Sequence, residues 1–288
     1  AVVNASVLKT MSAKWQKRFL TWGIIIAVFG MRLLFPILIV AITANISPLT
    51  VLQIVFQNPM EYARRLSEAH IIIAAFGGMF LFMVFLNYFL DKEKDVHWVK
   101  VVENYLILLG KFESIQVVIA LLVLLFFSEL APAAARLEML LSGVLGIIVY
   151  VIVGSIAQYM QEKESKALQR SLAGGGLALF LYLEILDASF SFDGVIVAFA
   201  ITRDIIFITA GLGIGAMFVR SLTVMLVQKK TLSKYRFLEH GAHWAIGALA
   251  VIMLLGIKYD IPELLTSLIG AVFLALSLIS SLGKKPVE

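Results

Sequence analysis

Long apolar runs separated by short polar connections organise the whole chain. A helix needs roughly 20 mostly apolar residues to cross about 30 Å of hydrocarbon. Eight runs meet this requirement, the third and seventh only with help from their flanks, and residues 1–8 have the character of the end of a further span. The eight runs cover residues 19–42, 70–90, 112–127, 138–158, 172–200, 206–227, 242–257 and 264–282. The pattern predicts an all-α, polytopic transmembrane helical bundle with about eight to nine spans.

Composition strengthens this prediction. Apolar residues make up 61% of the 288 residues and charged residues 15%, whereas a soluble domain has roughly 45–50% and about 25%. The mean hydropathy is +0.96. We therefore expect the lipid bilayer to be the main partner of the chain. Cysteine is absent, which excludes disulfides and thiolate metal sites.

The positive charges alternate between the two sides of the predicted membrane. Of the 24 Lys and Arg residues, 17 lie in one set of alternate connections, five lie in the other set, and two lie inside spans. The richer set comprises residues 9–18, 91–111, 159–170, 228–240 and the C-terminal tail. Cytoplasmic connections carry such an excess, so we expect a cytoplasmic C-terminus. Lipid headgroups and insertion explain the net charge of +5, and nucleic acid is not an expected partner.

Two spans share a feature that suggests an internal repeat. Arg32 and Arg220 lie at similar depths in spans predicted to run in opposite directions, and His70 and His243 open the spans that follow. Inverted repeats with a site near the membrane midplane recur among secondary transporters. We therefore expect a 3+3 inverted-repeat, transporter-like architecture. The single predicted domain, residues 1–288, has a first repeat at about 1–90, connecting spans at about 112–158, a second repeat at about 172–257 and a final span at 264–282.

The fifth run contains three carboxylates, Glu184, Asp187 and Asp193, which are the only acids deep within a predicted span. A charge at the membrane centre costs about 2.5–3.5 kcal/mol on insertion scales. Three such groups within ten residues are not expected on a lipid-facing surface. They must be protonated, paired with cations or bound to metal.

Helical spacing refines this hypothesis. Glu184, Asp187 and Ser191 share one face of an α-helix, while Asp193 falls on the opposite side unless the helix breaks. Ser191 and Gly194 could accommodate a break, so we predict one here. Carboxylate, hydroxyl and carbonyl oxygens suit Mn²⁺, Mg²⁺ or Ca²⁺. Glu184, Asp187, Ser191 and Asp193 are the predicted metal ligands.

Structural alternatives exist for each of these residues. The acids could simply pair with Arg32 and Arg220 to hold helices together, although three acids beside a predicted break favour function. An interfacial hydrogen bond is the simpler role for His70 and for His243, and an accessory ligand or pH sensor is the more specific one. No HExxH, GxSxG or Walker pattern occurs. We therefore expect neither an enzyme nor a permanently bound cofactor.

The segment from Leu183 to Gly194, with Ala198 and Thr202 beyond it, resembles the second signature of the TerC family, in particular its bacterial branch of unknown function. The chain is also similar to that family at residues 18–40, 70–85, 91–98, 211–227 and 235–253. The resemblance implies membership of the LysE-type transporter superfamily and a multi-pass location in the bacterial inner (plasma) membrane. It also implies links to tellurium resistance and Mn²⁺ export.

Two departures from the family pattern accompany this resemblance. The family's first acidic signature, of the form E-x-x-L-S-x-D-N, would directly precede the matching segment at residues 1–10, so the start of the chain looks trimmed. Arg203-Asp204 stands where relatives tend to carry Asn. We expect a divalent metal cation exporter, with Mn²⁺ as the leading substrate. The alternative is a non-transporting membrane scaffold in tellurite or envelope-stress resistance. Self-association and association with other membrane proteins both stay open.

Overall fold

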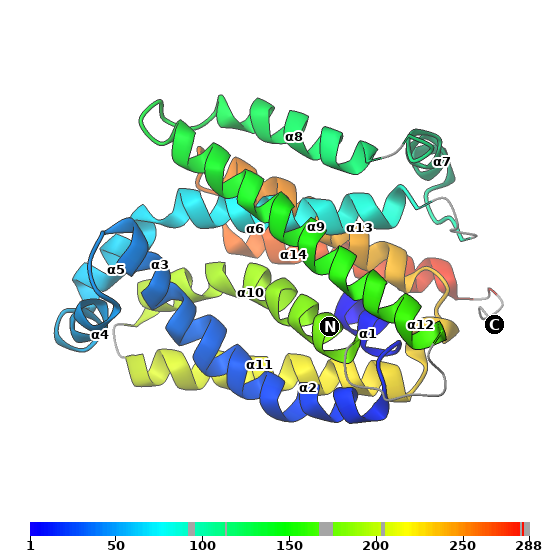
Figure 1. Ribbon diagram of the computed structural model, residues 1–288, viewed down its shortest axis with the longest axis horizontal. Helices are drawn as coiled ribbons and strands as arrows, with labels where there is room; N and C mark the ends of the chain where they lie inside the picture. Colours follow the sequence, from blue (N-terminus) through cyan, green and yellow to red (C-terminus); the bar gives the residue numbers. More distant parts are fainter. Residues whose placement is uncertain (92–95, 113, 167–174, 203–204, 283, 285–288) are drawn as a thin grey trace.

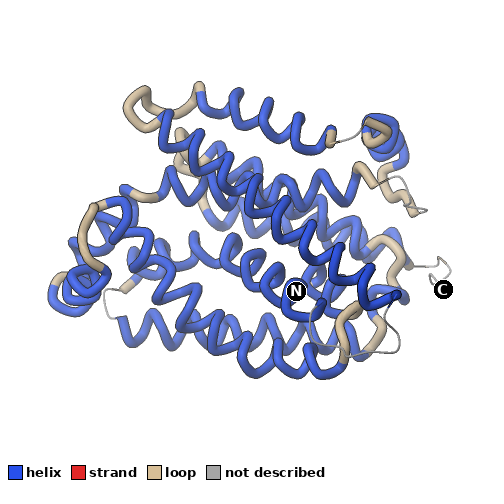
Figure 2. The backbone as a smooth tube through the Cα atoms, in the orientation of Figure 1, coloured by secondary structure: helices blue, strands red, loops and turns tan. Residues whose placement is uncertain are grey.

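The computed structural model shows helices joined by short connections, and no strand occurs in the part of the chain that it describes (Figures 1 and 2). The description covers all residues except 92–95, 113, 167–174, 203–204, 283 and 285–288. It also leaves out the side chains of residues 157–166, 175, 190–194, 196–197, 199–201, 205–206 and 263.

The helices follow one another along the chain with few intervening residues. They are α1 (Val2–Leu8), α2 (Ala13–Ile25), η1 (Ile26–Leu34), α3 (Phe35–Thr43), α4 (Pro48–Gln57), α5 (Pro59–Glu68), α6 (His70–Phe89), α7 (Lys100–Leu109), α8 (Ile115–Ser128), α9 (Arg136–Lys166), α10 (Gly175–Ile201), α11 (Ile205–Gln228), α12 (Thr231–Lys234), α13 (Leu238–Leu255) and α14 (Glu263–Ser281). η1 is a π-helix, and it joins α2 and α3 into one continuous helix.

Several helices are long and apolar enough to cross a bilayer, so the chain is a multi-pass integral membrane protein. Six such segments lie among the described residues: Ala13–Thr43, His70–Phe89, Arg136–Ile156, Phe207–Gln228, Leu238–Leu255 and Leu264–Ser281. α10 is also long, with 27 residues. α8 has only 14 residues, which extend about 21 Å and fall short of the hydrocarbon thickness. The run at 112–127 therefore forms a shorter helix than a full span requires.

The connections gather at two opposite ends of the bundle. Figure 1 shows α4 and α5 at one end, and α7, α12 and the C-terminus at the other. α4 and α5 form a helical hairpin in which each helix begins with proline. The side chains of Ser47 and Asn58 cap the two helices by accepting hydrogen bonds from the backbone N–H groups of Thr50 and Glu61. The hairpin therefore has local sequence signals, since Ser47-Pro48 and Asn58-Pro59 each place a capping side chain directly before a proline.

The connection between α6 and α8 contains a helix of its own. α7 occupies about half of residues 91–111. The side chains of Val101, Tyr105 and Leu108 share one face of α7 and are exposed. An exposed apolar face flanked by Lys100 and Lys111 is typical of a helix that lies in the membrane interface.

α6 is the most enclosed of the membrane-spanning helices, and it packs against α8, α9, α10 and α13. Glycines permit its closest approaches. A Cβ at Gly146 of α9 would collide with the backbone of Phe76, and a Cβ at Gly247 of α13 would lie 2.5 Å from the ring of Phe85. Small residues at helix crossings are the usual means of tight packing in membranes. This packing gives α10 a rigid support on one side.

The predicted break in the fifth span is wrong, because α10 is helical from Gly175 to Ile201, through Ser191 and Gly194. A helix satisfies its own backbone groups, and without water in the hydrocarbon that requirement outweighs the local preferences of Ser and Gly. The departure from α geometry lies instead in η1, where the π-helix runs for nine residues and contains Arg32. Short π segments inside α-helices are often found at functional sites.

Candidate functional site

Glu184 and Asp187 lie near the middle of α10, one helical turn apart on the same face. That face turns towards η1, α2 and α11, which all contact α10. Glu184 is 1% exposed and Asp187 is 7% exposed. Both carboxylates are therefore removed from the lipid and from the two ends of the bundle.

Arg220 of α11 provides the principal counter-charge. Its Nη2 donates to Glu184 Oε2 at 2.8 Å and to Asp187 Oδ2 at 3.4 Å. Its Nη1 donates to the backbone carbonyl of Phe19 at 3.3 Å, and the guanidinium lies 4.3 Å from the centre of the Phe19 ring. Arg220 is 1% exposed, so it joins α10, α11 and α2 by contacts made entirely inside the protein.

Arg32 reaches the same carboxylate from a different helix. Its Nη1 lies 3.9 Å from Asp187 Oδ2 and donates at 2.8 Å to the carbonyl of Ala27 in its own helix. The bond to Ala27 bends the side chain back along η1. The structure thus brings Arg32 and Arg220, from the two predicted repeats, to one oxygen of Asp187.

Glu184, Asp187, Arg32 and Arg220, here called the buried quartet, carry no net charge when all four are ionised. The quartet is nevertheless incompletely bonded. Glu184 Oε1 and Arg220 Nε are buried and have no hydrogen-bond partner. An unsatisfied buried polar atom costs about 1–3 kcal/mol. A cluster whose only task was to hold helices together would gain stability by bonding both atoms.

Gly23 of α2 makes room for the quartet, although no motif in the sequence singles it out. A Cβ at this position would collide with Nη1 of Arg220 and would lie 3.0 Å from Glu184 Oε1. Phe19, one turn earlier on the same helix, supplies the carbonyl and the ring that hold Arg220. Only their neighbours in space reveal the role of these two residues.

The other two predicted ligands, Ser191 and Asp193, have side chains that lie outside the described residues. Among the side chains that the structure does describe, no three His, Asp or Glu groups lie together in a way that would hold a metal ion. The four-residue ligand set therefore stays a prediction. For Glu184 and Asp187, the observed partners are the two arginines.

The predicted accessory histidines have other neighbours. His243 stacks on Tyr88 with ring centroids 3.6 Å apart, and its Nδ1 pairs with the carbonyl of Glu239 at 2.8 Å. His70, at the start of α6, lines an apolar cavity. None of these contacts involves Glu184 or Asp187.

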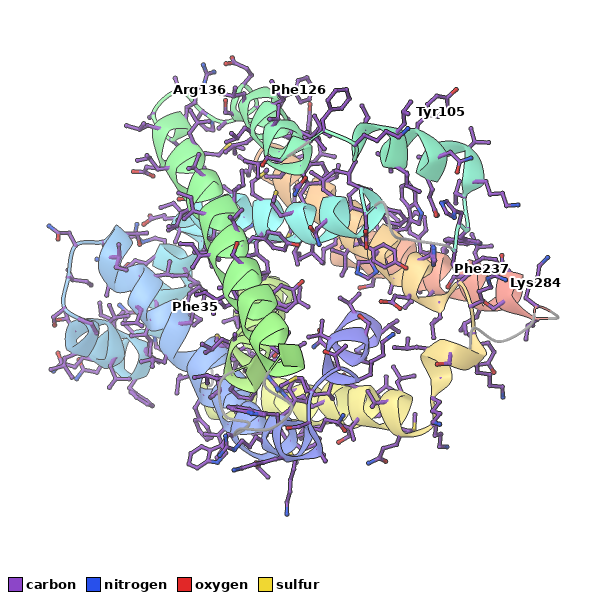
Figure 3. The ribbon with its side chains drawn as sticks, turned by 45° about the vertical axis from the view of Figure 1, so that its right-hand side comes forward. Phe35, Tyr105, Phe126, Arg136, Phe237 and Lys284 are labelled. Carbon is purple, nitrogen blue, oxygen red and sulfur yellow. The ribbon has the colours of Figure 1, made fainter. Side chains whose placement is uncertain are left out.

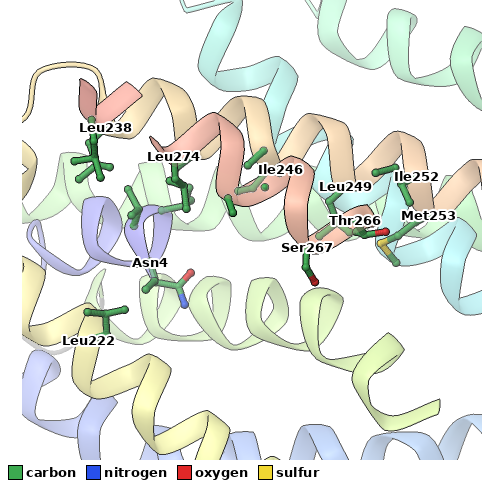
Figure 4. A pocket seen from close by; sticks show the side chains of 18 of the residues that line it. Asn4, Leu222, Leu238, Ile246, Leu249, Ile252, Met253, Thr266, Ser267 and Leu274 are labelled. Atoms are coloured by element: carbon green, nitrogen blue, oxygen red, sulfur yellow. The ribbon is translucent and has the colours of Figure 1, made fainter. Parts of the chain in front are cut away.

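A large cavity bordered by described residues is separate from the quartet. It has a volume of about 1400 Å³ and lies between α1, α11, α13 and α14 (Figure 4). Its wall is mainly hydrocarbon, as at Leu249, Met253 and Leu274, with the amide of Asn4 and a few hydroxyl groups. Such a wall suits apolar chains and offers few ligands to an ion.

Comparison with known proteins assigns the chain to a family. A family model described as "Protein of unknown function (DUF475)" matches residues 1–286. The chain belongs to the DUF475 family. No curated protein and no solved structure matches it. Because the DUF475 match covers every helix of the bundle, the buried quartet lies within the family's shared region. The TerC resemblance is not tested by this match and stays a prediction.

Proposed function

We propose that this DUF475 protein is a secondary transporter that exports a divalent cation, with Mn²⁺ as the leading candidate, using the carboxylates of α10. One observation carries the proposal: Glu184 and Asp187 lie buried in the middle of the bundle, paired with arginines from two other helices. Ionisable groups inside membrane spans are costly and usually mark ion or proton pathways. The choice of Mn²⁺ rests on the TerC resemblance alone.

The proposed mechanism is an exchange of counter-charges. Without substrate, the guanidiniums of Arg32 and Arg220 pair with the carboxylates of Glu184 and Asp187. A cation that reaches the carboxylates competes with the guanidiniums for the same oxygens, and Glu184 Oε1 is already without a partner. In the buried, low-dielectric site, a surplus positive charge is unfavourable. Loading and release would then be coupled to movement of an arginine or of a proton.

Three further features belong to this proposal. Residues 1–90 and 172–257 would act as inverted repeats that alternate around the quartet. Asp193 and Ser191 would complete the ligand set from α10. The protein would lie in the bacterial inner membrane with its C-terminus in the cytoplasm, as the lysine and arginine distribution indicates.

The test is Mn²⁺ flux in proteoliposomes containing the purified protein, followed with a metal-sensitive dye. We expect Glu184→Gln and Asp187→Asn each to lower the flux by at least about tenfold, because a hydrogen bond to a charged group contributes about 1.5–3 kcal/mol. Glu61→Gln and Asp260→Asn remove the same charges outside the quartet and should leave the flux unchanged. Normal flux in both quartet variants would overturn the proposal.

One observation favours the scaffold as a second candidate, namely the charge balance of the quartet. A neutral cluster needs no ion to complete it. If the protein is a scaffold, the wild type carries no Mn²⁺, and Asp187→Asn lowers the abundance of the protein in the membrane without changing cellular metal content. Measuring abundance and flux on the same preparations separates the two candidates.

A further inference from the structure

A small pocket at the end of the bundle that carries α7 and the C-terminus gathers three cations. It has a volume of about 400 Å³ and is lined by His97, Lys100, Asn104, Arg236, Phe237 and Lys284. No acidic side chain is among these lining residues. Among the described residues, no carboxylate forms an ion pair with Lys100, Arg236 or Lys284. Three like charges that converge on one pocket repel one another, and an anion would relieve that repulsion.

Partly buried hydrogen bonds hold in place the segments that line this pocket, namely the start of α7, the start of α13 and the end of α14. The carboxylate of Glu103, which is fully buried, accepts the backbone N–H groups of Trp98 and Val99 at 3.2 and 3.0 Å and fixes the start of α7 beside His97. His240 of α13 pairs through Nε2 with the carbonyl of Val96 at 2.6 Å. These bonds fasten α13 to the segment that precedes α7.

A further hydrogen bond connects the start of α13 to the end of α14. The backbone N–H of Phe237, just before α13, donates to Ser281 Oγ at the end of α14 at 2.9 Å. This bond holds the turn that contains Arg236 against the end of α14, just before Lys284, and Figure 3 shows Phe237 and Lys284 close together there. Lys100 and Asn104 lie one turn apart on α7. Lys100 thus projects from α7, while Arg236 and Lys284 project from the turns that adjoin α13 and α14.

The surroundings indicate what kind of anion fits. Arg236 and Lys284 flank the ends of two membrane-spanning helices, α13 and α14, which places the pocket where the chain leaves the hydrocarbon. Apolar side chains of the neighbouring segments are exposed: Tyr105 on α7 is 69% exposed, and Leu282 after α14 is 66% exposed. A soluble anion would gain nothing from these surfaces, whereas the acyl chains of a lipid would cover them.

We propose that this pocket binds the phosphate headgroup of an anionic phospholipid, with the acyl chains lying along α7 and α14. Basic pockets between membrane-spanning helices recognise such headgroups in general. The site is separate from the buried quartet, and it does not depend on the proposed transport. The predicted cytoplasmic position of this end of the bundle would place it against the leaflet richest in anionic lipid.

The test is native mass spectrometry of the full chain in detergent with added phosphatidylglycerol or phosphatidylcholine. We expect the wild type to retain phosphatidylglycerol about tenfold better. The combined variant Lys100→Gln, Arg236→Gln and Lys284→Gln should lower that preference to within about twofold. The control variant Lys14→Gln, Lys17→Gln and Lys229→Gln removes three exposed lysines elsewhere and should keep the preference. Lys100→Arg with Lys284→Arg should also keep it, which confirms that charge is the cause.

Three outcomes would overturn the proposal. The first is equal binding of the two lipids by the wild type. The second is an equal loss of preference in the control variant, which would indicate general attraction to a basic surface. The third is displacement of phosphatidylglycerol by inorganic phosphate that itself stays bound, which would assign the pocket to a soluble phosphate. The melting temperature of each variant shows whether a loss of binding reflects a loss of fold.

Discussion

The guanidinium of Arg220 divides its hydrogen bonds among acceptors on two helices, two carboxylates of α10 and one carbonyl of α2. Removing one partner of a buried ion pair leaves an uncompensated charge and costs about 3–5 kcal/mol, whereas replacing both partners with apolar groups is often neutral. The sequence identified Arg220 because it is one of only two basic residues inside predicted spans. It could not identify Gly23 or Phe19, since neither differs from ordinary residues of a membrane helix.

Substitution of Arg220 should therefore destabilise the protein more than substitution of the whole pair. We expect Arg220→Met to lower the unfolding free energy by about 3–5 kcal/mol, and the double variant Arg220→Met with Glu184→Met to recover part of the loss. Denaturant unfolding in detergent, followed by tryptophan fluorescence, measures both. Lys229→Met, at an exposed position outside both sites, is the control. Equal unfolding of Arg220→Met and this control would contradict the assignment.

Gly23 offers a more selective test of the quartet. In Gly23→Ala the new Cβ would collide with Nη1 of Arg220, so the guanidinium must move away from Glu184 while α2 stays helical. We expect a loss of Mn²⁺ flux with little change in helix content by circular dichroism. Gly215→Ala on α11 has no atom within 4 Å of the added Cβ and should behave as wild type. Unchanged flux in Gly23→Ala would show that the position of Arg220 is not needed for transport.

At the scale of elements, apolar run length predicted the helices better than local residue preferences did. The runs at 19–42, 70–90 and 264–282 correspond to continuous helices. The prediction of a break at Ser191 and Gly194 was wrong because it relied on the preferences of single residues. In lipid the backbone groups have no other hydrogen-bond partners, so the helix continues. The π-helix η1 ends just before Pro36, which has no N–H to continue the α-helical hydrogen bonding; η1 also packs against α10 and α11.

The α4–α5 hairpin carries an ion cluster whose pH dependence can be measured. Hydrogen bonds from Arg64 and Arg65 lower the pKa of Glu61 from 4.5 to about 2. Because this pKa lies below its ordinary value, the interaction stabilises the hairpin at neutral pH and is lost as the pH falls from about 4.5 to about 2. Carbon NMR of the Glu61 carboxyl group should show the low midpoint.

The control for this titration lies within the same chain. Arg64→Gln combined with Arg65→Gln should return the pKa of Glu61 towards 4.5, while Arg136→Gln, which pairs with Glu129 elsewhere, should leave it low. An unchanged titration midpoint of Glu61 after removal of Arg64 and Arg65 would mean that these arginines do not lower the pKa of its carboxyl group.

For the molecule as a whole, the distribution of positive charge and the position of the connections agree. The lysine-rich connections that contain α7 and α12 lie at the end of the bundle opposite α4 and α5 (Figure 1). Which end faces the cytoplasm follows from the insertion bias and stays a prediction. The inverted repeat also stays a prediction. The convergence of Arg32 and Arg220 on Asp187 is the arrangement that such a repeat would produce.

The absence of cysteine makes the orientation easy to measure. We expect Arg64→Cys, in the α4–α5 hairpin, to react with a membrane-impermeant maleimide added to intact cells. Lys229→Cys, at the opposite end of the bundle, should react only after the membrane is opened. Labelling is read by a mass shift on gels, with the cysteine-free chain as the control. Reaction of both positions from the same side would contradict the predicted topology.

The π-helix η1 also gives the bundle a way to move without a hinge. A π segment holds one residue more than an α-helix of the same length. Migration of the π segment along the helix would move that extra residue from one position to the next. Each residue that it passes turns by about 100° around the axis, while α2 and α3 keep their places. Arg32 lies within this segment, so a shift by one position would swing its guanidinium away from Asp187. A rotation confined to one turn would then separate Arg32, one of the two counter-charges, from Asp187. The lipid-facing surface of the protein would hardly change.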